Sequence, residues 1–153
     1  MHVMNGGTPE RYYALAGRPL LQVRTPGGGR AVLTLDPATG ALLPNYALYH
    51  RLSEGSVDLD ELDRSAFEAL LRHWRERILA ECEASAIQWT RTGDLDFPYA
   101  ATRAGQRLSL RLNDHPDEPL LTLFVGEEPI AHLEAWPEAW QRERSPLAAQ
   151  PQA

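Results

Sequence analysis

The chain of 153 residues contains no lysine, so all 15 of its basic residues are arginines. This absence excludes the phosphate-binding loop pattern G-x-x-x-x-G-K-[ST], which depends on a lysine. The glycine-rich stretch TPGGGR at 25–30 is therefore interpreted as a hairpin turn. Because alanine, glycine and proline are also abundant, we interpret the exclusive use of arginine as a sign of a GC-rich bacterial genome.

Cysteine is almost absent as well, since Cys82 is the only one, and this excludes an intramolecular disulfide. No apolar run approaches the roughly 20 residues that a membrane-spanning helix needs. The N-terminal residues MHVMNGGTPERYY lack the basic-then-apolar pattern of a secretion signal. These absences predict a cytoplasmic protein that makes no contact with a membrane.

Motifs of catalysis and metal binding are missing too. The sequence contains no H-E-x-x-H, no C-x-x-C and no G-x-S-x-G. The stretches DLDELD (58–63) and GDLDFP (93–98) lack the glycine and the distal glutamate of a calcium-binding EF-hand loop. The sequence therefore predicts no metal, no cofactor and no catalytic residue.

Two alternatives to this prediction stay open. His73 and Glu76 are one helical turn apart and have the spacing of a pair of metal ligands. Serine, histidine and aspartate on separate elements can also converge in space, because catalytic triads follow no fixed sequence order. A small enzyme that uses carboxylates and a histidine is therefore the alternative from another functional class.

The strongest structural pattern is an amphipathic helix over 65–84. Ser65 and Glu68 have the spacing of a capping box at its start. Apolar residues then recur three and four positions apart, which is the spacing of one helical face. The residues of this stripe are Phe67, Leu70, Leu71, Trp74, Ile78, Leu79 and Cys82. We expect the first five of them to be buried.

Short strands and turns are predicted on both sides of this helix. Before it come strands within 12–25, 30–36 and 41–44 and a short helix over 45–52. After it come strands within 87–92, 99–112, 119–125 and 129–135, with a hairpin turn at Ala104-Gly105 and a helical turn over 137–143. The expected fold is a single compact α+β domain with antiparallel β-meanders before and after a central helix. We expect it to span 11–144, between a disordered N-terminus (1–10) and a disordered tail (145–153).

Charge is distributed unevenly along the chain, which has a net charge of −6. Segment 113–143 holds eight of the 21 acidic residues but only one of the 15 arginines, Arg142. A nucleic-acid ligand would require a basic surface, so this balance argues against one. An acidic surface instead favours encounter with a basic partner.

The candidate partner-binding residues all lie in segment 113–143. They comprise acidic side chains, expected to be exposed and unpaired with arginine, and one tryptophan. Trp136 and Trp140 are four positions apart, so either both indoles pack on the sheet or one of them is a surface anchor for a partner. The candidates are Asp114, Asp117, Glu118, Glu127, Glu128, Glu134, Glu138 and Trp140.

These features predict a non-enzymatic acidic protein that binds a basic protein partner. Its most concrete form is a bacterial immunity or antitoxin-type protein that neutralises a toxin. Besides the enzyme, a secretion chaperone or adaptor is an alternative, and it would hold its partner in an extended state. A further interpretation is that the acidic residues only keep the edge of the sheet soluble.

Overall fold

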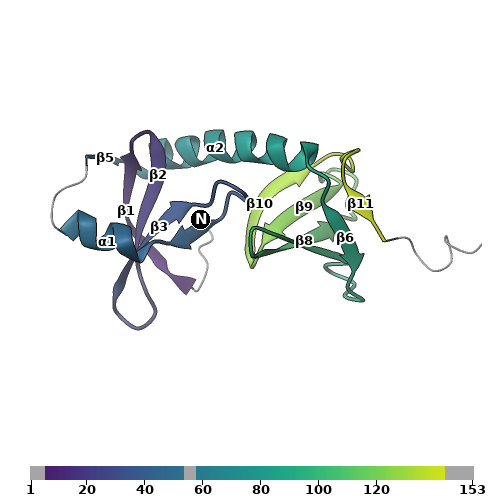
Figure 1. Cartoon of the computed structure of the whole chain (residues 1–153), viewed down its shortest axis with the longest axis horizontal. Helices are drawn as coiled ribbons and strands as arrows, with labels where there is room; N and C mark the ends of the chain where they lie inside the picture. Colours follow the sequence, from purple (N-terminus) through teal and green to yellow (C-terminus); the bar gives the residue numbers. More distant parts are fainter. Residues whose placement is uncertain (1–5, 54–57, 144–153) are drawn as a thin grey trace, which may run out of the picture.

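Two β-sheets lie along one long helix in the computed structural model of this chain, which describes residues 6–53 and 58–143 (Figure 1). The first sheet is antiparallel, with the strand order β4-β3-β2-β1-β5. Its strands are β1 (Thr8–Leu15), β2 (Arg18–Arg24), β3 (Arg30–Leu35), β4 (Leu42–Pro44) and β5 (Leu59–Leu62). The short helix α1 (Tyr46–Ser53) follows β4, as predicted, and the Asn45 side chain accepts a hydrogen bond from the Leu48 N–H at its start.

The second sheet has the strand order β10-β9-β8-β7-β6-β11. All neighbours in it are antiparallel except β11, which runs parallel to β6. Its strands are β6 (Gln88–Arg91), β7 (Tyr99–Arg103), β8 (Gln106–Leu112), β9 (Leu121–Val125), β10 (Glu128–Leu133) and β11 (Gln141–Arg142). The prediction of a single α+β domain is confirmed, and the strands form two sheets rather than one continuous sheet.

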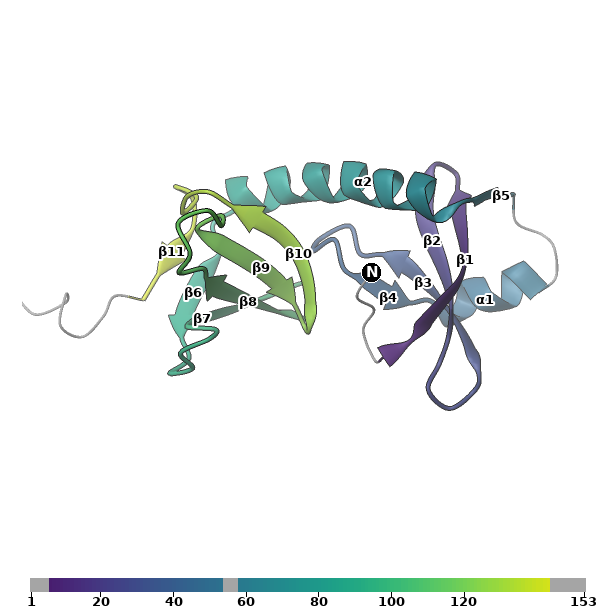
Figure 2. The same ribbon diagram turned by 180° about the vertical axis from the view of Figure 1, so that it is seen from behind.

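Helix α2 (Arg64–Ala84) joins the two sheets and lies along both of them (Figures 1 and 2). The predicted capping box is wrong, because the N-cap is Asp63, whose carboxylate accepts the N–H of Ala66 at 2.7 Å. Residues 59–62, in the acidic stretch that precedes the helix, form β5, which pairs with β1.

The buried stripe of α2 is narrower than predicted. Phe67 and Leu71 pack on the first sheet, while Ile78 and Cys82 pack on the second. Leu70 and Trp74 are only half-buried, so the prediction that they belong to the core is wrong. The physical reason is that the helix crosses from one sheet to the other between these two pairs of core residues.

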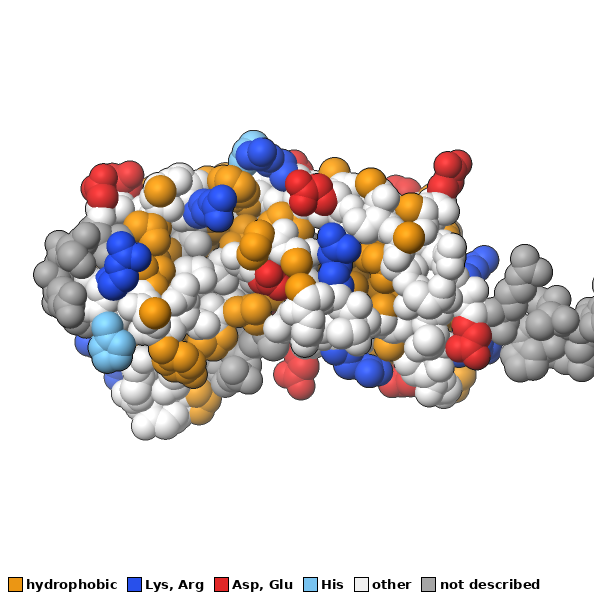
Figure 3. All heavy atoms as spheres, viewed as in Figure 1, with side chains coloured by type: hydrophobic (Ala, Val, Ile, Leu, Met, Phe, Trp, Pro, Cys, Tyr) orange, Lys and Arg blue, Asp and Glu red, His pale blue; other side chains and the backbone are white. Residues whose placement is uncertain are grey.

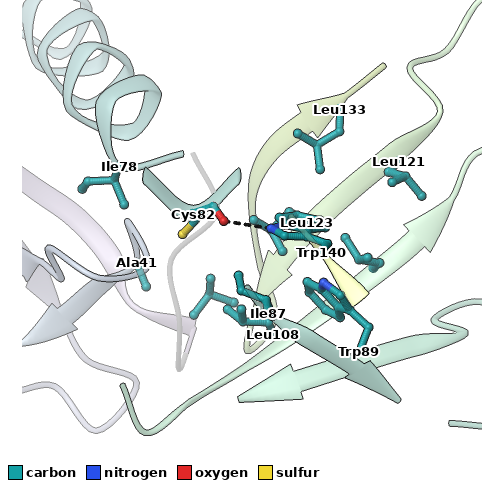
Figure 4. Packing of buried hydrophobic residues seen from close by; sticks show 12 residues of the cluster. Ala41, Ile78, Cys82, Ile87, Trp89, Leu108, Leu121, Leu123, Leu133 and Trp140 are labelled. Carbon is teal, nitrogen blue, oxygen red and sulfur yellow. Dashed lines mark hydrogen bonds between the residues drawn. The ribbon is translucent and has the colours of Figure 1, made fainter. Parts of the chain in front are cut away.

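The larger hydrophobic core lies between the C-terminal half of α2 and the second sheet (Figure 4). Trp89 is fully buried in it, and its ring centroid lies 5.0 Å from that of Trp140. The indole N–H of Trp140 donates to the Cys82 carbonyl at 2.8 Å, which ties the segment before β11 to α2. The other members are Ala41, Ile78, Ile87, Leu108, Leu110, Leu121, Leu123, Val125 and Leu133.

The predicted start of the ordered chain and one predicted element near its end need correction. β1 begins at Thr8, and Glu10 accepts a hydrogen bond from Arg24 at 2.8 Å, so 8–10 are not disordered. The predicted helical turn over 137–143 is wrong in its extent, because only one turn forms, in which the Trp140 N–H donates to the Pro137 carbonyl, and β11 follows it. The N–H groups of Gln141 and Glu143 donate to the carbonyls of Ile87 and Trp89. The predicted disorder of 1–5 and 145–153 lies outside the described residues.

The predicted hairpin turn at Ala104-Gly105 is confirmed, and Ala104 has a φ of 49° there. In this left-handed region the Cβ of alanine crowds the backbone, whereas glycine adopts it freely. Ala104→Gly is therefore expected to raise the free energy of unfolding by about 0.5–1 kcal/mol, measured by urea denaturation. The matched control Ala101→Gly, within β7, should lower it, because glycine weakens a strand. A loss of stability in Ala104→Gly would contradict the prediction.

Neither helix in the described part of the chain combines the length and the apolar character that crossing a membrane requires.

Candidate functional site

The loop between β8 and β9 carries three of the predicted acidic residues on an ordered turn. Asn113 closes the loop, since its backbone N–H donates to the Leu120 carbonyl and its side-chain amide donates to the Pro119 carbonyl at 2.7 Å. The Glu118 N–H donates to the His115 carbonyl at 3.0 Å. The carboxylates are therefore held on a defined backbone.

A chain of polar contacts connects this loop to the neighbouring strands. The Asn113 amide donates to the hydroxyl of Thr122 in β9 at 2.9 Å. That hydroxyl lies 3.1 Å from Nδ1 of His132 in β10. Thr122 is 1% exposed, so the loop is tied to β9 and β10 through a buried group.

Strand register brings two more predicted residues to the same end of the second sheet. Leu121 pairs with Leu133, so the loop before β9 and the segment after β10 lie side by side. All the acidic side chains contributed by these two segments are exposed. We call this group the acidic end, and it consists of Asp114, Asp117, Glu118, Glu134 and Glu138.

No arginine neutralises the acidic end within the described residues. One carboxylate oxygen of Asp117 lies 3.8 Å from Nδ1 of His115. This contact is an ion pair only when the histidine is protonated. Arg111, which has the outward position nearest this loop, donates to the Asn113 side chain at 3.2 Å and lies over Phe124. Arg142 lies over the Trp136 ring, with its guanidinium carbon 4.7 Å from the centroid.

Apolar side chains are exposed beside these carboxylates. Leu112, the last residue of β8, is 44% exposed and Leu120 is 46% exposed. Both adjoin the acidic loop, and the two residues belong to the few large hydrophobic side chains that are exposed in the described chain. Apolar groups rimmed by charged groups are the usual composition of a protein-binding surface.

Glu128 is not part of a binding surface, and its prediction as an exposed, unpaired carboxylate is wrong. The residue is 1% exposed. Its carboxylate accepts hydrogen bonds from the Arg75 guanidinium at 2.5 Å and from the backbone N–H of Leu42 at 3.4 Å. Arg75 also donates to the Gly40 carbonyl at 2.8 Å. This ion pair therefore connects α2, the β3–β4 turn and the second sheet.

Glu127 is exposed but lies away from the acidic end. It is in the β9–β10 turn, because Val125 pairs with Glu128. The five residues of β9 separate this turn from the loop before Leu121, and at roughly 3.3 Å per residue they span about 17 Å. The eight acidic residues of segment 113–143 therefore do not form one patch.

Trp140 is 4% exposed, so its prediction as a surface anchor is wrong. The alternative interpretation, in which both indoles pack on the sheet, fits the structure. Trp136 is half-buried and donates its indole N–H to the Trp140 carbonyl at 3.2 Å. Its ring also lies 5.4 Å from that of Tyr99 in β7.

The structure also bears on the reactivity of Cys82 and on the predicted alternative of a metal site at His73 and Glu76. Burial raises the pKa of the Cys82 thiol, which disfavours the reactive thiolate. His73 and Glu76 are not part of a metal-binding group, since no cluster of three or more potential ligands occurs among the described residues.

A groove of about 570 Å³ lies between α2 and β10, and sequence reasoning missed it. Its charged lining residues are of both signs: Glu68, Arg72, Arg75, Glu76 and Glu128. β10 is an edge strand, and Pro129 in it has no N–H to donate to an added strand. The groove therefore favours neither charge in a ligand and is poorly suited to strand addition.

Comparison with known proteins finds no matching family model, no matching curated protein and no matching solved structure.

Proposed function

We infer that this protein is a non-enzymatic binding protein that engages a basic protein partner through its acidic end. The observation that carries this proposal is a group of five exposed carboxylates at one end of the second sheet. No arginine pairs with them within the described residues. Such a group attracts a basic surface over a distance and orients it before contact.

The ordered loop supports the same proposal. Association costs conformational entropy whenever a flexible loop must be fixed in the complex. The hydrogen bonds of Asn113 hold the loop before any partner arrives, so less entropy remains to be lost. Exposed Leu112 and Leu120 add apolar area that a partner would bury.

In its most specific form, the proposal is that the partner is a bacterial toxin and that this chain acts as an immunity or antitoxin-type protein. A toxin that attacks nucleic acid needs a basic surface to bind phosphate groups. An acidic protein that covers this surface would block its substrate. The secretion chaperone is the less favoured alternative, because Pro129 interrupts the exposed edge of β10 that an extended partner would pair with.

The test is capture of the partner from a lysate of the source cells, followed by kinetics with the purified partner. The variant Asp117→Lys/Glu134→Lys/Glu138→Lys reverses three charges at the acidic end. At low salt its association rate should fall by about tenfold or more relative to the unchanged chain, because the long-range attraction becomes repulsion. The difference should shrink at high salt, where counter-ions screen surface charges.

The control is Glu127→Lys, which reverses the charge of an exposed side chain in the β9–β10 turn, at the opposite end of the sheet. Its association rate should change far less than that of the triple variant. Equal rates for the triple variant and the unchanged chain would show that the acids serve only solubility. If the captured partner arrests growth when expressed alone, co-expression of this chain should restore growth, and failure to do so would reject the immunity role.

A further inference from the structure

Two arginines converge on the indole ring of Trp74, at the flank of α2. The guanidinium carbons of Arg18 and Arg77 lie 5.2 and 5.0 Å from the ring centroid. The indole N–H donates to the Gly17 carbonyl at 2.9 Å, which holds the ring against the β1–β2 turn. Within the described residues, neither guanidinium forms an ion pair with a carboxylate. The aromatic ring attracts both cations, but it does not neutralise their charges.

Two adjoining hollows open beside this stack and share Arg18 and Leu35. The larger, of about 400 Å³, lies between α1 and the first sheet, and its charged lining residues are Arg18 and Arg51. The smaller, of about 190 Å³, is lined by Arg77 and by one carboxylate, that of Glu81. Three arginines and one glutamate therefore line the two hollows together, which we call the arginine groove.

The remaining lining of the arginine groove is largely apolar. Leu15, Pro19 and Leu48 line the larger hollow, and Pro37 and Ile78 line the smaller one. Figure 3 views the face that carries α1, β3 and α2, and hydrophobic side chains are exposed there with arginine side chains among them. The groove thus combines positive charge with apolar surface, in a protein whose overall charge is negative.

We propose that the arginine groove binds a peptide segment of a partner protein in which acidic residues alternate with or flank apolar residues. Carboxylates match the fork of donors on the guanidinium groups of Arg18 and Arg77, and apolar side chains match the apolar lining of the groove. A bare anion would leave that floor unused. A nucleic acid carries a charge on every nucleotide and would be repelled by a protein with a net charge of −6.

This surface is distinct from the acidic end and calls for a partner of the opposite charge. The proposed function and this inference can therefore fail independently of each other.

The experiment is a selection of peptides from a random-peptide phage library on the immobilised full chain. Peptides rich in Asp or Glu beside Leu, Ile or Phe should be enriched. The dissociation constant of a selected acidic peptide should rise by at least about tenfold in Arg18→Gln/Arg77→Gln, since two charge-assisted contacts are lost. The matched control Arg91→Gln/Arg107→Gln removes the same charge from exposed positions of the second sheet, and it should change the dissociation constant by less than about twofold.

Titration of the unchanged chain with the same peptide provides a readout that does not depend on the variant's folding. In NMR spectra the Trp74 indole N–H and the Arg18 and Arg77 Nε–H signals should shift and saturate together. The proposal is overturned if these signals do not move, or if the enriched acidic peptides bind the double variant as tightly. It is also overturned if inorganic phosphate or a single-stranded oligonucleotide displaces the peptide at equal concentration. Enrichment of basic peptides alone would reject this inference and would support the acidic end as the binding surface.

Discussion

Replacing Glu128 by alanine is expected to lower the free energy of unfolding by about 3–5 kcal/mol, which is the usual cost of breaking a buried ion pair from one side. The change leaves the Arg75 guanidinium without its carboxylate partner at a site where both side chains are largely buried, being 15% and 2% exposed. The change also removes the carboxylate that accepts a hydrogen bond from the Leu42 N–H. The loss is measured by urea denaturation, as a shift of the transition midpoint at an unchanged slope.

The neighbouring substitution Glu127→Ala is the control for this experiment. Glu127 is exposed, so its loss should change the free energy of unfolding by no more than about 0.5 kcal/mol. The double variant Arg75→Met/Glu128→Met should be more stable than Glu128→Ala alone, because no unpaired charge remains buried. If Glu128→Ala unfolded at the same urea concentration as the unchanged chain, the ion pair would not join the two sheets in the way described.

Trp89→Ala is expected to lower the free energy of unfolding by about 3–5 kcal/mol, the range found when a buried large aromatic side chain is removed. Trp89 is 0% exposed and packs against the rings of Trp136 and Trp140. Trp89→Phe should cost less, because an aromatic ring is kept. Its indole N–H has no hydrogen-bond partner among the described residues, so that substitution removes no hydrogen bond.

Trp74→Ala is the comparison that tests which side chains of α2 belong to the core. Trp74 is half-buried, and it contributes one hydrogen bond and contacts with two arginines. Its loss should therefore cost only about 1–2 kcal/mol. Both losses are read from urea denaturation curves. A larger loss from Trp74→Ala than from Trp89→Ala would mean that the core lies under the middle of α2 rather than at its ends.

Much of the secondary structure could be predicted because it depends on neighbours in sequence. The spacing of Phe67, Leu71, Ile78 and Cys82 requires a helix if these side chains are to share one face. The turn at Ala104-Gly105 is likewise a local feature, set by a glycine with a φ of 76°. The missed strand β11 is different. It forms because Gln141 and Arg142 meet β6, more than 50 residues earlier in the chain.

The candidate site was predicted in part, and the errors have the same origin. The sequence identified segment 113–143 as acidic, but it could not show which of these acidic side chains lie on the same surface. The register of β9 against β10 separates Glu127 from Glu134. The arginine groove gave no local signal, because Arg18 and Trp74 lie far apart in the chain and meet only where α2 crosses the β1–β2 turn.

By itself the sequence determined the α+β class, the central helix, most strand positions and the concentration of acid near the C-terminus. Each of these follows from composition or from the periodicity of a helix or a strand. The tertiary structure alone decided which charges are available to a partner. Glu127 and Glu128 are adjacent and chemically identical, yet only Glu128 meets Arg75, 53 residues away, and Leu42, 86 residues away. Burial of that side chain depends on how the two sheets and α2 meet, and no local pattern encodes this contact.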